Sequence, residues 1–476
     1  MKLPARIFAL VVTVVGLGMA RPAAAMPADT PWTTVRTIKD LMGEAAGAGQ
    51  DIHLILVHGM RTSDRTTWDG FRARLCAHLG GQCRSETPPV RLTDRLILAD
   101  TPPSADYMGE AVWADDGPNE SSRHTASEKW MGSQPFVDHY RFPLRNGRFL
   151  IVDEINYWPM LFAFKCQFIV KEDVKLAGPD KTNIDFCSAN DDTHFPWFSS
   201  AEQHGLESWT PLGGKAPLVN GWIKNPILDW GITDAVLTLG TLKDFTRETV
   251  RCAFADVAAL RPSDFDASGG EAAPRSFHCA GQTLGAGPLP AANTRFVVMS
   301  HSLGAFVLMD TFAAAAGDAN YYDADDNCRV GSASRRDDAS SHRIASAATA
   351  ATMQTNQSLC FILRNSDSLY FFANQFPLLE LARTQGISEP TDDSPHTSAL
   401  ILWAETVSNA GETKQIVAFS DPGDILTFEV PKIEGAAVIN AYPKNSNRWF
   451  GLFENPIDAH VNYLTSKDVL DAVFGQ

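Results

Sequence analysis

Short apolar runs alternate with segments of helical spacing along most of the chain. Residues 52–57 are apolar except for His53, which is typical of a central parallel strand covered by helices on both faces. Further strands are predicted at 149–152, 295–299, 369–373, 416–419 and 436–440. Helices are predicted at 33–47, 67–79, 233–260, 343–364 and 466–474, with one more that ends near 316. This alternation predicts an α/β class, with helices on both faces of a mostly parallel central sheet.

Four polar stretches interrupt the pattern, and we interpret them as long loop insertions. They are rich in Pro, Gly, Ser and Asp and show no sustained periodicity. The stretches cover about 84–146, 172–215, 262–293 and 317–342. At about 150 residues per domain the chain has room for three domains, so the domain number depends on how the remaining motifs are spread.

Composition excludes several classes of protein. The chain has 476 residues, 44% of them hydrophobic and 20% charged, which does not fit a fibrous, coiled-coil or disordered protein. Forty Lys and Arg residues stand against 56 Asp and Glu residues, for a formal net charge of −16. Such a surface repels phosphate backbones and anionic lipids, so we expect no nucleic-acid partner.

The first 25 residues have the pattern of a secretory signal peptide. Lys2 and Arg6 precede an apolar run over 7–19, and three alanines that end at Ala25 suit a processing peptidase. The apolar run is shorter than the ~20 residues that a membrane span requires. We therefore predict cleavage near Ala25, export to the periplasm or the medium, and no transmembrane anchor in the mature chain.

Because export would place the chain in an oxidising compartment, we expect its eight cysteines, an even number, to form disulfides. Eight cysteines allow 105 pairings, and sequence alone does not choose among them. Pairing each cysteine with its neighbour along the chain gives 76 with 83, 166 with 187, 252 with 279 and 328 with 360. No C-x-x-C pair occurs, so we expect no metal site.

A predicted strand–turn–helix surrounds Ser302. An exposed nucleophile at such a turn needs small residues two positions before and after it, because the backbone is strained and crowded there. Ser300 and Gly304 occupy those positions, so the motif is a G-x-S-x-G elbow in which Ser replaces the first Gly.

With this elbow the chain resembles the α/β-hydrolase superfamily, in its lipase and esterase branch. The resemblance implies a serine nucleophile, an acid and a histidine in that order along the chain. Ser302 maps to the nucleophile, and His460, before the last predicted helix, maps to the histidine. The acid is either Asp424, which two apolar residues follow, or Asp421, which could instead stabilise the Pro-Gly turn. We favour Asp424.

The resemblance also implies an oxyanion hole made of two backbone N–H groups. These map to Met60, in the His58-Gly59-Met60 turn after the first central strand, and to Leu303, which follows the nucleophile. Each such donor contributes about 3 kcal/mol in comparable sites. Gly59 would allow the backbone to approach closely.

Because these motifs spread from residue 52 to 460, we predict one enlarged domain over 26–476. The expected activity is that of an exported serine hydrolase that needs no cofactor and cleaves a small or lipid-like carboxylic ester. A thioesterase, an amidase, a glycan deacylase and a binding protein that kept the fold without catalysis remain alternatives.

Overall fold

The structure is a computed structural model, and residues Val35–Gln476 form one compact unit in it. It describes residues 35–59, 67–79, 89–102, 110–114, 124–144, 147–177, 181–189, 195–209, 231–240, 242–266, 274–279, 294–316, 358–359, 361–376, 378–379, 399–401, 403–404, 414–445, 448–449, 453–454 and 456–475. The predicted signal peptide and the stretch 317–342 lie outside these residues.

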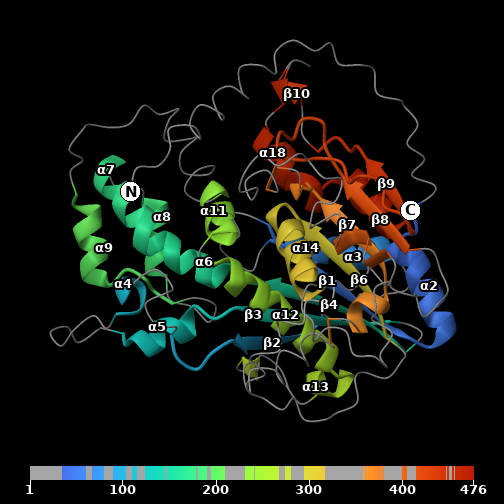
Figure 1. Cartoon of the computed structure of the whole chain (residues 1–476), viewed down its shortest axis with the longest axis horizontal. Coiled ribbons are helices and arrows are strands. Elements are labelled where there is room, and N and C mark those ends of the chain that lie inside the picture. Colours follow the sequence, from blue (N-terminus) through green and yellow to red (C-terminus); the bar gives the residue numbers. More distant parts are fainter. Residues whose placement is uncertain are drawn as a thin grey trace, which may run out of the picture. The chain divides into compact units, whose positions relative to one another are not determined.

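Nine strands of the described part form a single sheet in the order β5-β2-β3-β4-β1-β6-β7-β8-β9 (Figure 1). Their bounds are Asp51–Val57 (β1), Val90–Ile97 (β2), Phe136–Pro143 (β3), Phe149–Asn156 (β4), Arg275–His278 (β5), Thr294–His301 (β6), Ser366–Phe372 (β7), Lys414–Phe419 (β8) and Ala436–Ala441 (β9). The strands from β4 to β9 in this order pair in parallel, and β3 pairs antiparallel with both β2 and β4. The predicted α/β class with a mostly parallel sheet is confirmed. A separate small hairpin pairs Arg448–Trp449 (β10) with Phe453–Glu454 (β11).

Helices cover both faces of the sheet, because each central strand is apolar on both sides. In β1, Ile55 and Val57 face one apolar cluster, whereas Leu54 and Leu56 face another. The first cluster includes residues of α12 (Lys243–Ala259) and α14 (Leu303–Ala316), which cross the front of the sheet in Figure 1. The second includes residues of α2 (Ile38–Ala48), α3 (Asp69–Leu79) and α19 (Lys467–Phe474).

The remaining helices include α4 (Glu110–Trp113), α5 (Ala126–Gly132), α6 (Trp158–Phe164), the π-helix η4 (Lys165–Val170), α7 (Lys171–Ala177), α8 (Lys181–Ser188), α9 (Ser200–Glu207), α11 (Thr233–Leu239), α13 (Pro262–Asp266), α18 (Pro456–Val461) and the 3₁₀ turn η7 (Asn462–Leu464). Most of them extend the first cluster, whereas α13 contributes Phe265 to a third, small cluster, and α18 and η7 lie near the chain's end. Among the described residues, no helix has the length and apolar character to cross a bilayer.

The interpretation of 84–146, 172–215 and 262–293 as loop insertions was wrong in part. The second stretch supplies most of α7 and the helices α8 and α9. The first supplies β2 and β3, and the third supplies the helix α13 and the edge strand β5. These strands carry polar residues at positions that the fold buries, Asp94 and His139 among them. The apolar alternation that marks a half-buried strand is therefore weak there.

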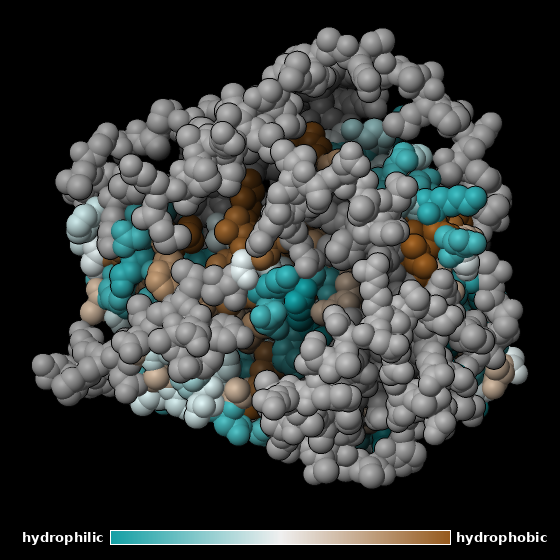
Figure 2. Space-filling view, viewed as in Figure 1, coloured by the Kyte–Doolittle hydropathy of each residue, from teal (hydrophilic) through white to brown (hydrophobic). Residues whose placement is uncertain are grey.

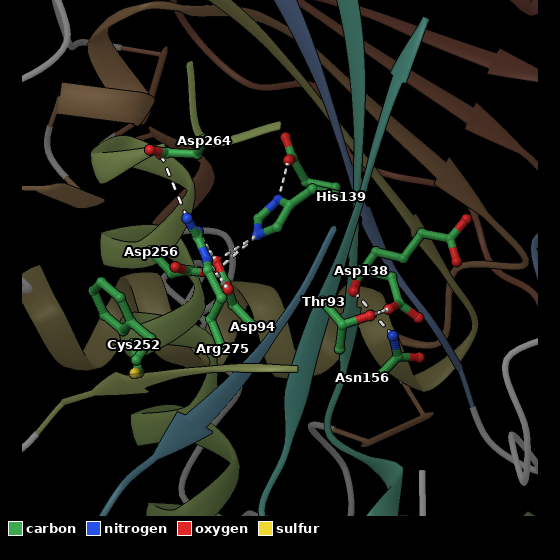
Figure 3. Close-up of polar contacts among 12 residues, drawn as sticks. Thr93, Asp94, Asp138, His139, Asn156, Cys252, Asp256, Asp264 and Arg275 are labelled. Atoms are coloured by element: carbon green, nitrogen blue, oxygen red, sulfur yellow. Dashed lines mark hydrogen bonds and ion pairs between the residues drawn. The ribbon is translucent and has the colours of Figure 1, made fainter. Parts of the chain in front are cut away.

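The polar residues of these strands form a buried network against α12 (Figure 3). His139 Nδ1 lies 2.6 Å from Asp153, and its Nε2 lies 3.0 Å from Asp256. Burial alone lowers the pKa of His139, but the surrounding carboxylates outweigh it and raise the pKa well above its ordinary value. At the open end of the network, Arg275 of β5 pairs with Asp94. The network joins five elements, β2, β3, β4, β5 and α12, by charge-assisted hydrogen bonds instead of apolar packing.

Two of the four expected disulfides are present, Cys166–Cys187 and Cys252–Cys279. The first links η4 to α8, and the second links α12 to the end of β5. The other two expected pairs, 76 with 83 and 328 with 360, involve side chains outside the described part of the chain.

Candidate active site

The predicted site residues follow the carboxyl ends of β1, β6 and β8. After β1 the chain passes to β2 and returns through β3 to β4 on one side of β1, whereas β6 to β9 lead away from β1 on its other side, so the direction of the connections changes at β1. In open α/β sheets a crevice forms at such a reversal, beyond the carboxyl ends of the strands. The sequence places His58, Ser302 and Asp424 at this edge.

Ser302 occupies the turn between β6 and α14 in a left-handed backbone conformation, with φ of 54°. Its N–H donates to the carbonyl of Phe372, 2.8 Å away at the end of β7. A non-glycine residue in this region costs roughly 1–2 kcal/mol, which the surrounding packing must offset. The strained turn directs the Ser302 hydroxyl to the ring of His460.

Two glycines allow this turn to lie against the end of β1. A Cβ atom on Gly304 would lie 2.2 Å from the carbonyl oxygen of His58, and one on Gly59 would lie 2.5 Å from the Cβ of Ser302. Backbone carbonyls cannot yield to a side chain as a flexible group can, so both positions require glycine. Ser300, the other small residue of the elbow, is fully buried at the end of β6.

His460 lies in α18 and bridges Ser302 and Asp424. Its Nε2 is 2.8 Å from Ser302 Oγ, and its Nδ1 is 2.8 Å from Asp424 Oδ2. Its side chain is 11% exposed, whereas that of Asp424 is fully buried. The structure thus brings together three side chains that are separated by up to 158 positions along the chain.

The two candidate acids have different neighbours. Asp424 also accepts a hydrogen bond from the N–H of Leu426 at 2.9 Å, and the hydroxyl of Tyr463 lies 3.3 Å from its Oδ2. Asp421 instead accepts from the N–H of Gly423 at 2.7 Å and from that of Asn445, so it stabilises the turn. The structure places Asp424, and not Asp421, against His460.

A second histidine, His301, is adjacent to the nucleophile along the chain but has a structural role. Its Nε2–H donates to the backbone carbonyl of His460 at 2.9 Å, which holds α18 over the end of β6. Burial, together with the nearby His460, lowers the pKa of His301 to about 4, so it stays neutral near neutral pH.

The turn predicted to supply the oxyanion hole is described only as far as Gly59. Leu303 begins α14 and is buried, whereas Met60 lies outside the described residues. His58 is clamped by Tyr157, whose N–H donates to His58 Nε2 at 3.2 Å and whose hydroxyl donates to the His58 carbonyl at 2.9 Å. The two rings stack with centroids 4.0 Å apart.

These contacts settle which nitrogen of His58 carries the proton. Because Nε2 accepts from Tyr157, the proton is on Nδ1 and is donated to the carbonyl of Gly59 at 2.9 Å. Burial lowers the pKa of His58 to about 3, so the ring is a neutral structural part of the turn.

Asp94, His139 and Asp256 are the described residues that could hold a metal ion, since their ligand atoms lie within 4.8 Å of one another. In the structure the protein's own cations face these carboxylates. His139 contacts Asp153 and Asp256, and Arg275 pairs with Asp94 (Figure 3).

The comparisons with known proteins identify no relative: no protein-family model, no curated protein and no solved structure matches the chain.

Sequence reasoning did not identify two buried tyrosines that contact residues of the site. Tyr157 and Tyr463 contact His58 and Asp424, but nothing in their sequence context distinguishes them from core aromatics. The aromatic stretch from Tyr157 to Phe164 is entirely buried, so these residues belong to the core.

Proposed function

We propose that this protein is a serine hydrolase of the α/β-hydrolase type, exported after removal of residues 1–25, that cleaves a carboxylic ester. The observation that carries the proposal is the hydrogen-bonded chain Ser302–His460–Asp424 at a strained turn after a parallel strand. A nucleophile, a base and a group that orients the base are the parts that acyl transfer requires.

In the proposed reaction Ser302 Oγ attacks the ester carbonyl carbon while His460 Nε2 accepts the hydroxyl proton. The tetrahedral intermediate collapses, and His460 returns this proton to the leaving alkoxide, which departs as an alcohol. Water then attacks the acyl-enzyme with His460 as base, and the acid is released with Ser302 restored. Asp424 holds the proton on Nδ1 of His460 and stabilises the imidazolium.

The charge of the tetrahedral intermediate would be held by backbone N–H groups. We assign these to Leu303, after the nucleophile, and Met60, after the clamped His58-Gly59 turn. Along the chain Leu303 follows Ser302 and Met60 follows Gly59, and Gly59 and Ser302 approach each other closely.

Apolar residues beside the site support an acyl substrate. Ile425, next to Asp424, is 71% exposed, and Val461, next to His460, is 42% exposed. Val236 on α11 and Ile232 directly before this helix are also exposed, and Figure 2 shows hydrophobic surface at the place of α11. A surface of this kind suits the hydrocarbon part of an ester better than a highly charged substrate.

The test is covalent labelling by a fluorophosphonate. We expect the wild-type protein to be labelled at one site and Ser302→Ala not to be labelled, with the same circular dichroism spectrum for both. A folded wild-type protein that fails to react would overturn the proposal. Rates on matched oxyesters, thioesters and amides then test the substrate class, and preference for a thioester or amide would contradict the ester assignment.

A further inference from the structure

Tyr463 is a buried tyrosine whose hydroxyl contacts the acid of the candidate triad. Its O–H donates to Oδ2 of Asp424, and the two oxygen atoms lie 3.3 Å apart. The same oxygen of Asp424 lies 2.8 Å from Nδ1 of His460, so the tyrosine and the histidine share one carboxylate oxygen. A carboxylate oxygen has about two lone-pair sites, which allows both donors to bind at once.

The hydroxyl of Tyr463 has a second partner, which fixes the direction of its hydrogen. The backbone N–H of Asp421 donates to the phenolic oxygen, so the phenolic hydrogen is directed to Asp424. Burial and the nearby carboxylate of Asp424 raise the pKa of Tyr463 well above its ordinary value. The phenol therefore keeps its proton near neutral pH and acts as a donor to Asp424, not as a proton carrier.

Both side chains that bind this oxygen come from one short helical segment. His460 lies in α18, and Tyr463 follows three residues later in η7. Residues three apart lie on the same side of such a segment. At the other oxygen of Asp424, the N–H of Leu426 donates to Oδ1 at 2.9 Å. The carboxylate is thus held at both oxygens, with Tyr463 holding the one that contacts His460.

The titratable groups around His460 come from the elements packed against it. Asp424, after β8, is its ion-pair partner and has a fully buried side chain. His301, at the end of β6, donates to the His460 carbonyl and stays neutral near neutral pH, because burial lowers its pKa to about 4. Asp458, on α18 itself, is exposed, so solvent screens its charge. The charge of Asp424 therefore dominates, and Tyr463 is placed to moderate it.

We propose that Tyr463 is a positioning residue of the triad, which orients Asp424 and weakens its attraction for the imidazolium of His460 by donating to the oxygen that they share. This inference rests on the proposed hydrolase function. A hydrogen bond to a carboxylate stabilises its charged form and lowers the charge that it presents to a second partner. His460 then releases its proton at a lower pH and is available as the base over a wider pH range.

Two replacements change this donor in opposite directions. Tyr463→Phe removes the hydroxyl and keeps the ring, whereas 3-fluorotyrosine at the same position, introduced by nonsense suppression, has a more acidic phenol and is a stronger donor. The readout is the acidic midpoint of the pH profile of kcat/KM, which reports the base of the free enzyme. Rates are measured on a p-nitrophenyl ester at the isosbestic wavelength of p-nitrophenol, per site titrated with the fluorophosphonate.

The two replacements should shift this midpoint in opposite directions. We expect Tyr463→Phe to raise it by about 0.5–1 pH unit, because Asp424 then binds the imidazolium more strongly, and 3-fluorotyrosine to lower it by a smaller amount. A tyrosine with a purely structural role would give no such reversal. The proton on Nδ1 of His460 provides a second readout. Its low-field NMR resonance, which His460→Ala should lack, should move to lower field in Tyr463→Phe.

Tyr370 provides the matched control. It is buried in β7, and its hydroxyl lies 3.3 Å from Nε2 of Gln415. Gln415 is near the start of β8, whereas Asp424 follows the end of this strand, so the Tyr370 hydroxyl lies toward the opposite ends of the strands from the triad. Tyr370→Phe should lose stability, as Tyr463→Phe does, but should keep the wild-type midpoint and low-field resonance.

The outcomes distinguish this inference from the proposed function. If the wild type reacts with the fluorophosphonate but both replacements leave the midpoint unchanged, or shift it in the same direction, the role of Tyr463 is overturned and the hydrolase assignment stands. An unmoved resonance in Tyr463→Phe would also overturn it. If Tyr463→Phe does not fold, the fluorotyrosine protein decides, and a midpoint at or above the wild-type value overturns the role. A wild type that does not react overturns both.

Discussion

Asp421 and Asp424 lie three residues apart, yet the fold gives them different tasks. Asp424 contacts the ring of His460, whereas Asp421 accepts backbone hydrogen bonds from Gly423 and Asn445. Both were candidates from sequence, because both follow the same strand. Only the path of the turn after β8 decides which carboxylate faces the imidazole.

Replacing these acids by their amides should therefore have unequal effects. We expect Asp424→Asn to lower kcat by about 10⁴-fold, because an amide does not hold the required tautomer of His460 or stabilise its cation. Asp421→Asn should lower stability by about 1–3 kcal/mol through its turn contacts and leave kcat per titrated site nearly unchanged. Steady-state kinetics with active-site titration measures both, and equal losses of kcat would contradict the assignment of Asp424.

At the scale of elements, the site depends on how closely the β6–α14 elbow approaches the end of β1. Gly304 lies in the first turn of α14 and faces the carbonyls of Val57 and His58. The motif around Ser302 predicted a strand, a turn and a helix, and all three are present. The strands β2, β3 and β5 were not predicted, because residues such as Asp94 and His139 are buried through hydrogen bonds that sequence periodicity does not reveal.

Adding a single methyl group should test how closely the β6–α14 elbow packs against the end of β1. In Gly304→Ala the added Cβ would lie 2.2 Å from the His58 carbonyl oxygen, so the elbow must move away from β1. We expect the free energy of unfolding to fall by about 1–3 kcal/mol, with slower fluorophosphonate labelling because Ser302 and the oxyanion turn separate.

Gly205 provides the matched control. It lies in α9, and a Cβ at this position would meet no atom within 4 Å. Gly205→Ala should raise stability by about 0.5–1 kcal/mol, since alanine favours a helix, and should not change the labelling rate. Wild-type stability and labelling in Gly304→Ala would show that the elbow is not packed as described.

At the scale of the whole molecule, a buried lysine makes stability depend on pH. Lys414 begins β8, is 2% exposed, and donates from Nζ to the carbonyls of Leu363 and Trp403 at 3.1 and 2.8 Å. Burial lowers its pKa from 10.5 to about 7. Between these two pH values the unfolded chain binds more protons at this site than the folded protein does, so stability rises with pH.

The contribution of Lys414 is measured by comparison with a variant. We expect the free energy of unfolding of the wild type to rise relative to that of Lys414→Met from pH 7 to 9, by up to about 1.4 kcal/mol per pH unit. Urea unfolding at fixed temperature gives this difference, in which groups common to both proteins cancel. Lys39→Met, at an exposed position of α2, should follow the wild-type curve. Parallel curves for the wild type and Lys414→Met would contradict the shift.

The sequence by itself determined the class of fold, the order of most central elements and two of the three side chains that meet at the candidate site, Ser302 and His460. It did so because strands covered on both faces are apolar throughout, and because the small residues around Ser302 meet a local steric requirement. Only the tertiary structure decided between Asp424 and Asp421, placed the polar strands of the sheet, and paired Lys165 with Asp234 in the interior. These features depend on contacts between residues distant along the chain, which no local pattern of hydrophobic and polar residues encodes.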